Sequence, residues 1–174
     1  IVGGYHPTFK YKEALNEGAD IVVRFEGEYT TLELANVIEK YGINYSMLKN
    51  IKGIAYKTSD NELVVTENRA PISNLDELPW PARHLLPMDK YTVFNKPIKV
   101  AHVMASRGCP YGCVYCTTSY FWGRLVRFRS AKKVVDEIEY VVEKYGTKSI
   151  VFADDELTLN RRFVEEFIKE IRER

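Results

Sequence analysis

The sequence predicts an α/β protein built in two parts. β-branched runs alternate with amphipathic stretches at both ends of the 174-residue chain, which is the pattern of parallel strands joined by helices. Between these ends, residues 70–91 contain four prolines and show no sustained periodicity, so an irregular connector is expected there. We therefore expect one domain over residues 1–50, a hairpin and proline-rich linker over 51–97, and the start of a second domain over 98–174.

The first domain is expected to begin at the end of a buried strand. The stretch "IVGG" is an apolar run that ends in a glycine turn, and two helix patterns alternate with one further strand pattern after it. Thr30 or Thr31 is the expected N-cap of the second helix, and Gly42 its stop. The expected elements are a strand ending at 1–4, a helix over 8–18, a strand over 19–25 and a helix over 30–42.

Residues 51–68 predict a β-hairpin. Two alternating runs in "IKGIAYKTSDNELVVTEN" are separated by Ser59, Asp60 and Asn61, which are common turn residues. The proline-containing connector follows this hairpin.

The second domain is expected to open with a β-α-β unit. Residues 98–106 read as a strand, residues 130–145 as a helix capped by Ser130 and closed by Gly146, and residues 148–153 as a second strand. Such units make parallel strands whose carboxyl ends open on the same edge. A final helix follows, with Asn160 as its cap.

Composition and charge exclude several classes of function. The chain is 45% hydrophobic and 28% charged with a net charge of +1, so no overall field attracts nucleic acid or anionic lipid. No apolar run approaches the roughly 18 residues that cross a bilayer, and no signal-peptide pattern is visible. A cytoplasmic protein is expected. Because the chain starts and ends inside regular patterns, it reads as an internal piece of a longer protein.

All three cysteines lie within eight positions, as Cys109, Cys113 and Cys116. Their odd number and close spacing argue against a disulfide framework. Structural zinc needs four ligands, and the nearest further candidate, His102, lies on the preceding strand. A catalytic thiol needs one cysteine beside a histidine. Thiolates are the usual ligands of iron–sulfur clusters, and a [4Fe–4S] cluster on three thiolates leaves one iron open to a small molecule; zinc with inert thiols stays as the alternative.

The C-x3-C-x2-C spacing, with Tyr115 before the last cysteine, resembles the signature of the radical S-adenosylmethionine (radical SAM) superfamily. The resemblance implies that Cys109, Cys113 and Cys116 each bind one iron, and that the fourth iron chelates the amino and carboxylate groups of SAM. Tyr115 would lie against the adenine. One electron from an external donor such as a ferredoxin or flavodoxin would then yield a 5′-deoxyadenosyl radical, which acts on a small-molecule substrate. No catalytic residue is assigned.

Acidic residues follow the second strand of the β-α-β unit. Asp154, Asp155 and Glu156 leave that strand at the edge from which the cysteine loop leaves the first strand, so we expect them to face the open iron. In the superfamily this position usually holds a glycine-glycine-glutamate motif that contacts the SAM amino group, and here the motif is Asp-Asp-Glu. The alternative is an acidic cap on the following turn.

Basic residues lie between the cysteine loop and the helix at 130–145. By resemblance they hold the SAM carboxylate or substrate, with Arg127 as the candidate; the alternative is a solvated basic edge. A nucleic-acid interface is the least favoured interpretation, because no recognition fold surrounds these residues. The basic residues are Arg124, Arg127 and Arg129.

The order "GGYHPTF", "ADIVVRFEGE" and "LDELPWPARHLLPMDKY" ahead of the cysteines resembles cobalamin-binding radical SAM proteins. The resemblance implies the C-terminal part of a Rossmann-like cobalamin-binding domain followed by the start of a partial (β/α) TIM barrel. Gly3 and Gly4 would then approach the buried nucleotide tail of cobalamin, where a side chain would collide with it; an ordinary strand-to-helix turn is the alternative. The chain departs from the family at Phe25, where glycine is usual, and it lacks the motif that supplies a cobalt-binding histidine.

The predicted function is radical SAM chemistry with cobalamin-dependent methyl transfer, or a related ring formation or rearrangement. A tRNA methylthiotransferase-like enzyme is a second hypothesis, but such enzymes carry three further cysteines upstream, and this chain has none before Cys109. A non-catalytic zinc or iron–sulfur binding module is the third, and it would not respond to SAM.

Overall fold

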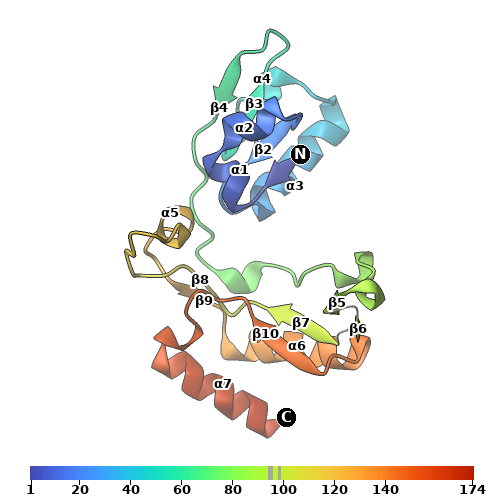
Figure 1. The fold of residues 1–174 in the computed structure, drawn as a ribbon, viewed down its shortest axis with the longest axis vertical. Coiled ribbons are helices and arrows are strands. Elements are labelled where there is room, and N and C mark those ends of the chain that lie inside the picture. The colour runs from blue at the N-terminus through green and yellow to red at the C-terminus, as the bar shows by residue number, and fades with distance from the viewer. Residues whose placement is uncertain (94–95, 98) are drawn as a thin grey trace. The chain divides into compact units, whose positions relative to one another are not determined.

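The computed structural model describes residues 1–93, 96–97 and 99–174, and it divides the chain into two units, residues 1–72 and 73–174. Each unit combines helices with a sheet, as the sequence predicted (Figure 1). Within the part of the chain that the structure describes, no helix is long and apolar enough to cross a bilayer.

The first unit is built on a four-stranded sheet in the order β1-β2-β3-β4. β1 (Val2–Gly3) runs parallel to β2 (Ile21–Val23), whereas β3 (Ile54–Lys57) and β4 (Leu63–Val65) are antiparallel additions. The predicted hairpin is confirmed as β3 and β4. It lies in the first unit instead of in a linker, because β3 pairs directly with β2. The sheet is therefore mixed, where the alternating pattern had suggested a parallel one.

Helices cover both faces of this sheet. α1 (Tyr5–Phe9) leads into α2 (Tyr11–Asn16), which packs on one face, while α3 (Glu28–Tyr41) and α4 (Tyr45–Leu48) pack on the other (Figure 1). Successive residues of β2 point to opposite faces, so both sides of the strand are buried. The buried residues are Leu15, Val22 and Ala55 on the α2 side, and Ile21, Val23, Leu34, Leu48, Ile51, Ile54 and Tyr56 on the α3 side.

The start of α3 differs from its prediction. Gly27 is the N-cap, so Thr30 lies inside the first turn and is fully buried. Its hydroxyl donates to the carbonyl oxygen of Lys52 at 3.2 Å and accepts from Arg69 Nε at 2.8 Å. A threonine that holds two distant segments in this way is not available as a cap. The predicted stop is confirmed, because Gly42 ends the helix with a φ of 65°.

The second unit contains the predicted β-α-β unit. β7 (Val100–Val103) and β10 (Ser149–Phe152) pair in parallel, and α6 (Ala131–Tyr145) connects them. The strand expected over 98–106 is shorter than predicted, and its first position, residue 98, lies outside the described residues. Both helix caps are confirmed by local geometry. The side chain of Ser130 accepts the backbone N–H of Lys133, and Gly146 adopts the left-handed conformation.

An apolar core joins this β-α-β unit to the last helix. α7 (Arg161–Glu173) begins at the predicted cap Asn160, whose side chain accepts the N–H of Phe163 at 3.2 Å. The ring of Phe163 packs against Phe128 and Phe167, with centroids 5.0 and 6.0 Å away. The remaining elements are short: η1 (Leu75–Glu77), η2 (Arg83–Leu85), η3 (Met88–Lys90), β5 (Thr92–Val93), β6 (Lys96–Pro97), β8 (Ser106–Arg107), α5 (Thr118–Phe121), β9 (Arg127–Phe128) and η4 (Leu157–Leu159).

Candidate functional site

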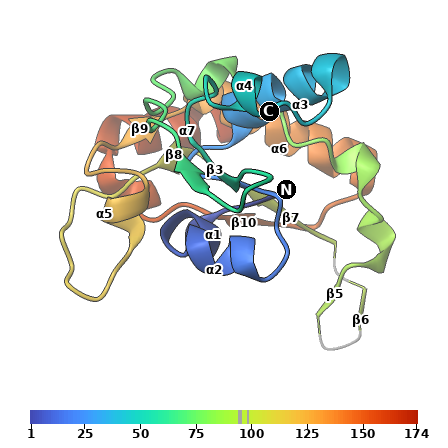
Figure 2. The same cartoon turned by 90° about the horizontal axis from the view of Figure 1, so that it is seen from above.

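Residues 108–126 form one long loop that is closed at its base by a short strand pair. β8 and β9 are antiparallel, and Figures 1 and 2 show the loop, with α5 on it, projecting beyond them. Gly108 opens the loop with a φ of 100°, and a Cβ at this position would collide with the carbonyl oxygen of Leu125. Only glycine meets both conditions, so the loop closes tightly just before its first cysteine.

Asp154 ties the base of this loop to the end of β10. Its carboxylate accepts the backbone N–H of Ala105 at 3.1 Å and both the N–H and the hydroxyl of Ser106 at 2.5 Å. The carboxyl ends of β7 and β10 therefore meet at one edge, as predicted. Asp154 was expected to face a ligand, but its oxygens hold the neighbouring strand end instead.

The three cysteines lie on the loop as free thiols. Cys113 is exposed, while Cys109 and Cys116 are half-buried. The backbone N–H of Cys116 donates to the carbonyl oxygen of Cys113 at 3.1 Å, so these two residues share one turn. Hydrogen bonds from Thr118 lower the pKa of Cys116, with the larger effect from its side chain and the smaller from its backbone. Burial and the charge of Asp155 oppose this shift. A lowered pKa favours the thiolate, which is the form that binds metals.

The acidic residues after Asp154 reach the loop to different extents. Thr118 Oγ1 donates to Asp155 Oδ1 at 3.1 Å, so the exposed Asp155 lies beside the turn that carries Cys116. Glu156 is half-buried and accepts the hydroxyl of Thr158 at 2.7 Å. Of the predicted acidic residues, Asp155 is thus the one that the structure places in contact with the cysteine loop.

The outer part of the loop is open to solvent. Tyr115 is 89% exposed, which leaves its ring free to contact a planar ligand. Arg124 lies over the middle of the loop. Its Nη2 is 2.5 Å from the position that a Cβ on Gly112 would take. The predicted Arg127 lies in β9 at the loop base and is only 6% exposed. Arg124 is therefore the exposed arginine at the loop.

No single-ion metal site is preformed. Across residues 1–93, 96–97 and 99–174, no three histidine, cysteine, aspartate or glutamate side chains come together closely enough to hold one metal ion. A closed zinc site would need four such ligands around one point. A four-iron cluster instead presents a different iron to each thiolate, so its ligands are spread around a larger group. Three thiolates are a donor set that such a cluster accepts.

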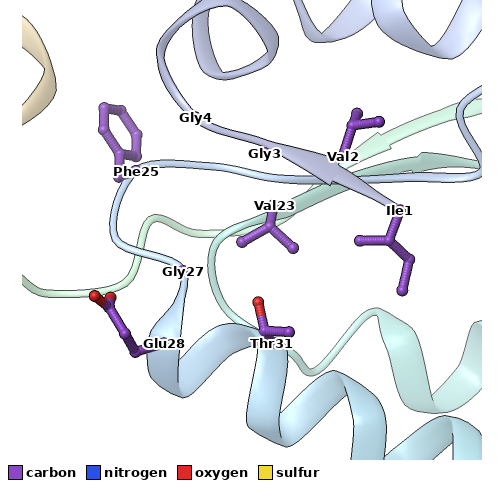
Figure 3. A pocket seen from close by; sticks show the side chains of 9 residues that line it. All are labelled: Ile1, Val2, Gly3, Gly4, Val23, Phe25, Gly27, Glu28 and Thr31. Atoms are coloured by element: carbon purple, nitrogen blue, oxygen red, sulfur yellow. The ribbon is translucent and has the colours of Figure 1, made fainter. Parts of the chain in front are cut away.

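A second candidate site lies in the first unit, at the ends of β1 and β2. A hollow of about 500 Å³ opens between these strands and the start of α3, and we call it the Gly3–Gly4 hollow. Figure 3 shows the side chains of Val23 and Thr31 pointing into it, while the ring of Phe25 points away. Its lining is Ile1, Val2, Gly3, Gly4, Val23, Phe25, Gly27, Glu28 and Thr31.

Backbone conformation shapes this hollow. Gly4 has a φ of 98° with no atom within 4 Å of where a Cβ would be, so the turn leaves open space. Phe25 has a φ of 61°, in the left-handed region that favours glycine. Its backbone N–H donates to Thr8 Oγ1 at 3.0 Å, and its ring packs on Phe9 at 6.4 Å. These contacts hold a conformation that glycine would adopt without strain.

Comparisons with known proteins agree with this geometry. Residues 103–174 match the profile of the Radical SAM superfamily. The uncharacterized methyltransferase PH0819 of Pyrococcus horikoshii is 41% identical over 165 residues, which cover 93% of this chain and 34% of the relative. The anaerobic magnesium-protoporphyrin IX monomethyl ester cyclase of Rubrivivax gelatinosus is 36% identical over 173 residues, which cover 98% of this chain and 31% of the relative. The chain belongs to the radical SAM superfamily.

A solved structure extends the likeness to the fold. The cobalamin-dependent S-adenosylmethionine radical enzyme OxsB, with aqua-cobalamin and S-adenosylmethionine bound, matches 100% of this chain and 24% of its own, with a TM-score of 0.74 and 20% identity. This likeness shows a shared α/β fold. The chain spans about a third of the length of the curated relatives it matches.

The radical SAM region carries a buried ionic network that the sequence reading missed. Glu137 on α6 is 1% exposed and pairs with Arg83 Nη2 at 2.6 Å and with Arg129 Nη1 at 2.5 Å. Arg83 comes from the connector, which is therefore part of the second unit. Asp76, also from the connector, accepts the backbone N–H of Ser130 at the start of α6.

One signal in the sequence could have revealed this network. Glu137 lies three residues after Val134 and four before Val141, so it falls on the apolar stripe of the helix. A charge on a buried face requires a partner of opposite charge. The pattern thus predicts that a cation is needed, although it does not indicate which one.

Proposed function

We propose that this chain carries a [4Fe–4S] cluster on Cys109, Cys113 and Cys116 and binds S-adenosylmethionine at the open iron. The observation that supports this most is the loop itself: three free thiols on a glycine-closed loop, at the strand edge where Asp155 also lies. When bound, the cluster and SAM supply a 5′-deoxyadenosyl radical, with one electron taken from an external donor of the ferredoxin or flavodoxin class and methionine released.

The described residues fit such a group. The Thr118 hydrogen bonds favour the thiolate of Cys116, and the exposed ring of Tyr115 offers an apolar face for an adenine. Asp155 offers a carboxylate to an ammonium group, and the exposed Arg124 offers a guanidinium to a carboxylate. Opposite charges beside the loop therefore match the two charged ends of an amino acid.

We further propose that the first unit binds cobalamin, with the Gly3–Gly4 hollow receiving part of that ligand. The absence of side chains at the turn allows a close approach to the backbone. Gly27, the N-cap of α3, lines the same hollow and has no side chain to accept the first N–H groups of the helix. Such groups suit a phosphate. In this reading, residues 1–72 are the end of a Rossmann-like domain and residues 98–174 the start of a partial barrel.

The reaction that these cofactors support best is methyl transfer or a related radical reaction on a small molecule. Relatives over nearly the whole chain are named as a methyltransferase and as a cyclase. Both names fit radical activation of a carbon that is otherwise unreactive.

Anaerobic reconstitution tests the cluster and its ligand. The purified protein, loaded with iron and sulfide and then reduced, is expected to give a [4Fe–4S] EPR signal that changes when SAM is added. Protein whose thiols were first blocked with iodoacetamide is the control and should take up no cluster. A fully loaded sample whose spectrum ignores SAM would remove the proposal, and so would a tightly held zinc ion in place of iron and sulfide.

Cobalamin binding is tested separately. Incubation with hydroxocobalamin followed by gel filtration should leave a corrin absorption band on the protein. Its absence would withdraw the cobalamin assignment and leave the cluster assignment intact.

A further inference from the structure

We propose that Glu137 is a positioning residue for the cysteine loop and that it acts through Arg83 and Arg129. The inference rests on the proposed function, in which the cysteine loop holds a cluster. Glu137 lies on α6 and outside the loop, and its carboxylate is almost fully buried. Its role is therefore to fix other groups instead of touching a ligand.

The first connection runs through Arg129. Its Nη1 donates to Glu137 Oε2 at 2.5 Å and to the carbonyl oxygen of Met104 at 3.0 Å. Its backbone N–H donates to the carbonyl oxygen of Ala105 at 2.8 Å. One arginine thus joins α6 to both sides of the loop base, since Met104 and Ala105 precede the loop and Arg129 follows it.

The second connection runs through Arg83. Its Nη2 donates to Glu137 Oε1 at 2.6 Å and to the carbonyl oxygen of His102 at 2.7 Å. His102 lies on β7, two residues before Met104. Both arginines therefore hold the same stretch of strand, and both depend on one carboxylate.

The charge balance makes Glu137 the centre of this network. Breaking a buried ion pair by removing one partner is strongly destabilising, and here one carboxylate pairs with two guanidinium groups. Loss of its charge leaves two buried cations close together, which repel each other. Because each arginine also holds a carbonyl of the strand before the loop, this repulsion is expected to loosen the loop base on both sides at once.

The test compares two substitutions on the same helix. Glu137→Gln keeps the shape of the side chain and removes its charge, whereas Val141→Ala opens a cavity at a fully buried apolar position one turn further along the same helix. After reconstitution, iron release to a chelator is expected to be about tenfold faster for Glu137→Gln than for the wild type, as for residues that support metal ligands from behind. Val141→Ala should release iron at the wild-type rate despite a lower melting temperature. Equal acceleration in both variants would show a contribution to stability alone and would overturn the proposal.

Hydrogen–deuterium exchange on the iron-free protein keeps the test independent of the cluster. Amides at residues 104–107 and 127–129 should exchange faster in Glu137→Gln, while those of β2 and β3 in the first unit stay unchanged. Unchanged exchange at the loop base would overturn the proposal. If the wild type binds no cluster, the proposed function fails and the exchange data alone decide the positioning role. If Glu137→Gln does not fold, Arg83→Met replaces it. This variant removes the hold on the carbonyl of His102 and leaves the Glu137–Arg129 pair in place, so exchange should quicken before the loop, at residues 104–107, and stay at the wild-type rate at residues 127–129. Unchanged exchange at residues 104–107 would overturn the proposal.

Discussion

The two candidate sites of this chain are built in opposite ways. The Gly3–Gly4 turn is short, leads directly into α1, and makes its hollow by leaving side chains out. The cysteine loop is long, and side chains from outside it hold its base: both Asp154 and the Glu137 network bind the segment that precedes the first cysteine. Both lie where parallel strands end, where such folds commonly bind ligands. Under the proposed function, the first site recognises the shape of cobalamin and the second supplies protein ligands to the cluster.

The largest effect should follow from removing one sulfur. Cys113→Ala is expected to abolish [4Fe–4S] loading, because two thiolates cannot hold a cluster that already lacks a fourth protein ligand. Iron and sulfide per protein, measured after anaerobic reconstitution, should fall to background. Cobalamin uptake should stay at the wild-type level, since Cys113 is exposed and lies in the other unit. Cluster loading that survives would disprove the ligand assignment.

Substitutions at the adjacent residues Asp154 and Asp155 test two different roles. Asp154 holds the base of the loop, and Asp155 is the proposed contact with SAM. Asp154→Ala leaves the buried N–H groups of Ala105 and Ser106 without their acceptor. It is expected to lower the unfolding free energy by about 2–3 kcal/mol. Asp155→Ala should leave the unfolding free energy close to that of the wild type, because this side chain is exposed. It should instead weaken the SAM-induced change in the EPR spectrum.

Chemical denaturation of both variants checks the first effect, and a SAM titration of the reconstituted protein checks the second. The division of roles would be wrong if the two substitutions destabilised the protein equally, or if Asp155→Ala bound SAM as the wild type does.

Local patterns in the sequence were sufficient for the β-α-β unit. The caps Ser130, Gly146 and Asn160 were predicted because each acts on its own backbone within a few residues. The spacing of the three cysteines is equally local, and the ligand role that it indicates stays a prediction. What depends on distant partners was not predicted: Arg83 meets Glu137 across 54 residues.

The same reason explains why the cap of α3 and the place of the hairpin were predicted wrongly. From the sequence alone Thr30 is a suitable cap, but in the fold its hydroxyl bonds to Arg69 and Lys52, which are distant in the chain. The hairpin resembles part of a linker until β3 pairs with β2. Sequence periodicity shows which face of an element is buried, but it does not identify the partner strand.

The shape of the first site is tested by two glycines with similar φ angles. Gly4 and Gly18 have φ angles of 98° and 101°, and neither has an atom within 4 Å of the position that a Cβ would take. Alanine at each should therefore cost roughly 1–3 kcal/mol through backbone strain. Gly4 lines the hollow and Gly18 does not, so only Gly4→Ala should also weaken cobalamin binding.

Equilibrium binding followed by corrin absorption would measure this difference. Wild-type affinity in both variants would show that the turn does not approach the ligand. Equal losses would point to strain in the unit as a whole.

The smallest effect concerns the thiol of Cys116 in the iron-free protein. The Thr118 hydroxyl has one proton and two acceptors, Cys116 and Asp155. Thr118→Val removes the larger cause of the lowered pKa, so the pKa of Cys116 should rise and its alkylation by iodoacetamide should slow at mildly acidic pH. Asp155→Ala removes a repelling charge and the competing acceptor, so the pKa should fall further and alkylation at the same pH should quicken.

These opposite signs distinguish a specific hydrogen bond from general changes in loop exposure. Thr117→Val is the matched control, because Thr117 is exposed, adjacent and makes no side-chain cap. Mass spectrometry would measure how fast Cys116 is alkylated relative to Cys109 at a series of pH values, and this gives the change in the pKa of Cys116 in each variant. Two changes of the same sign would mean that loosening of the loop, and not the shared proton, governs this thiol. At high pH all variants should react alike, because every thiol is then ionised.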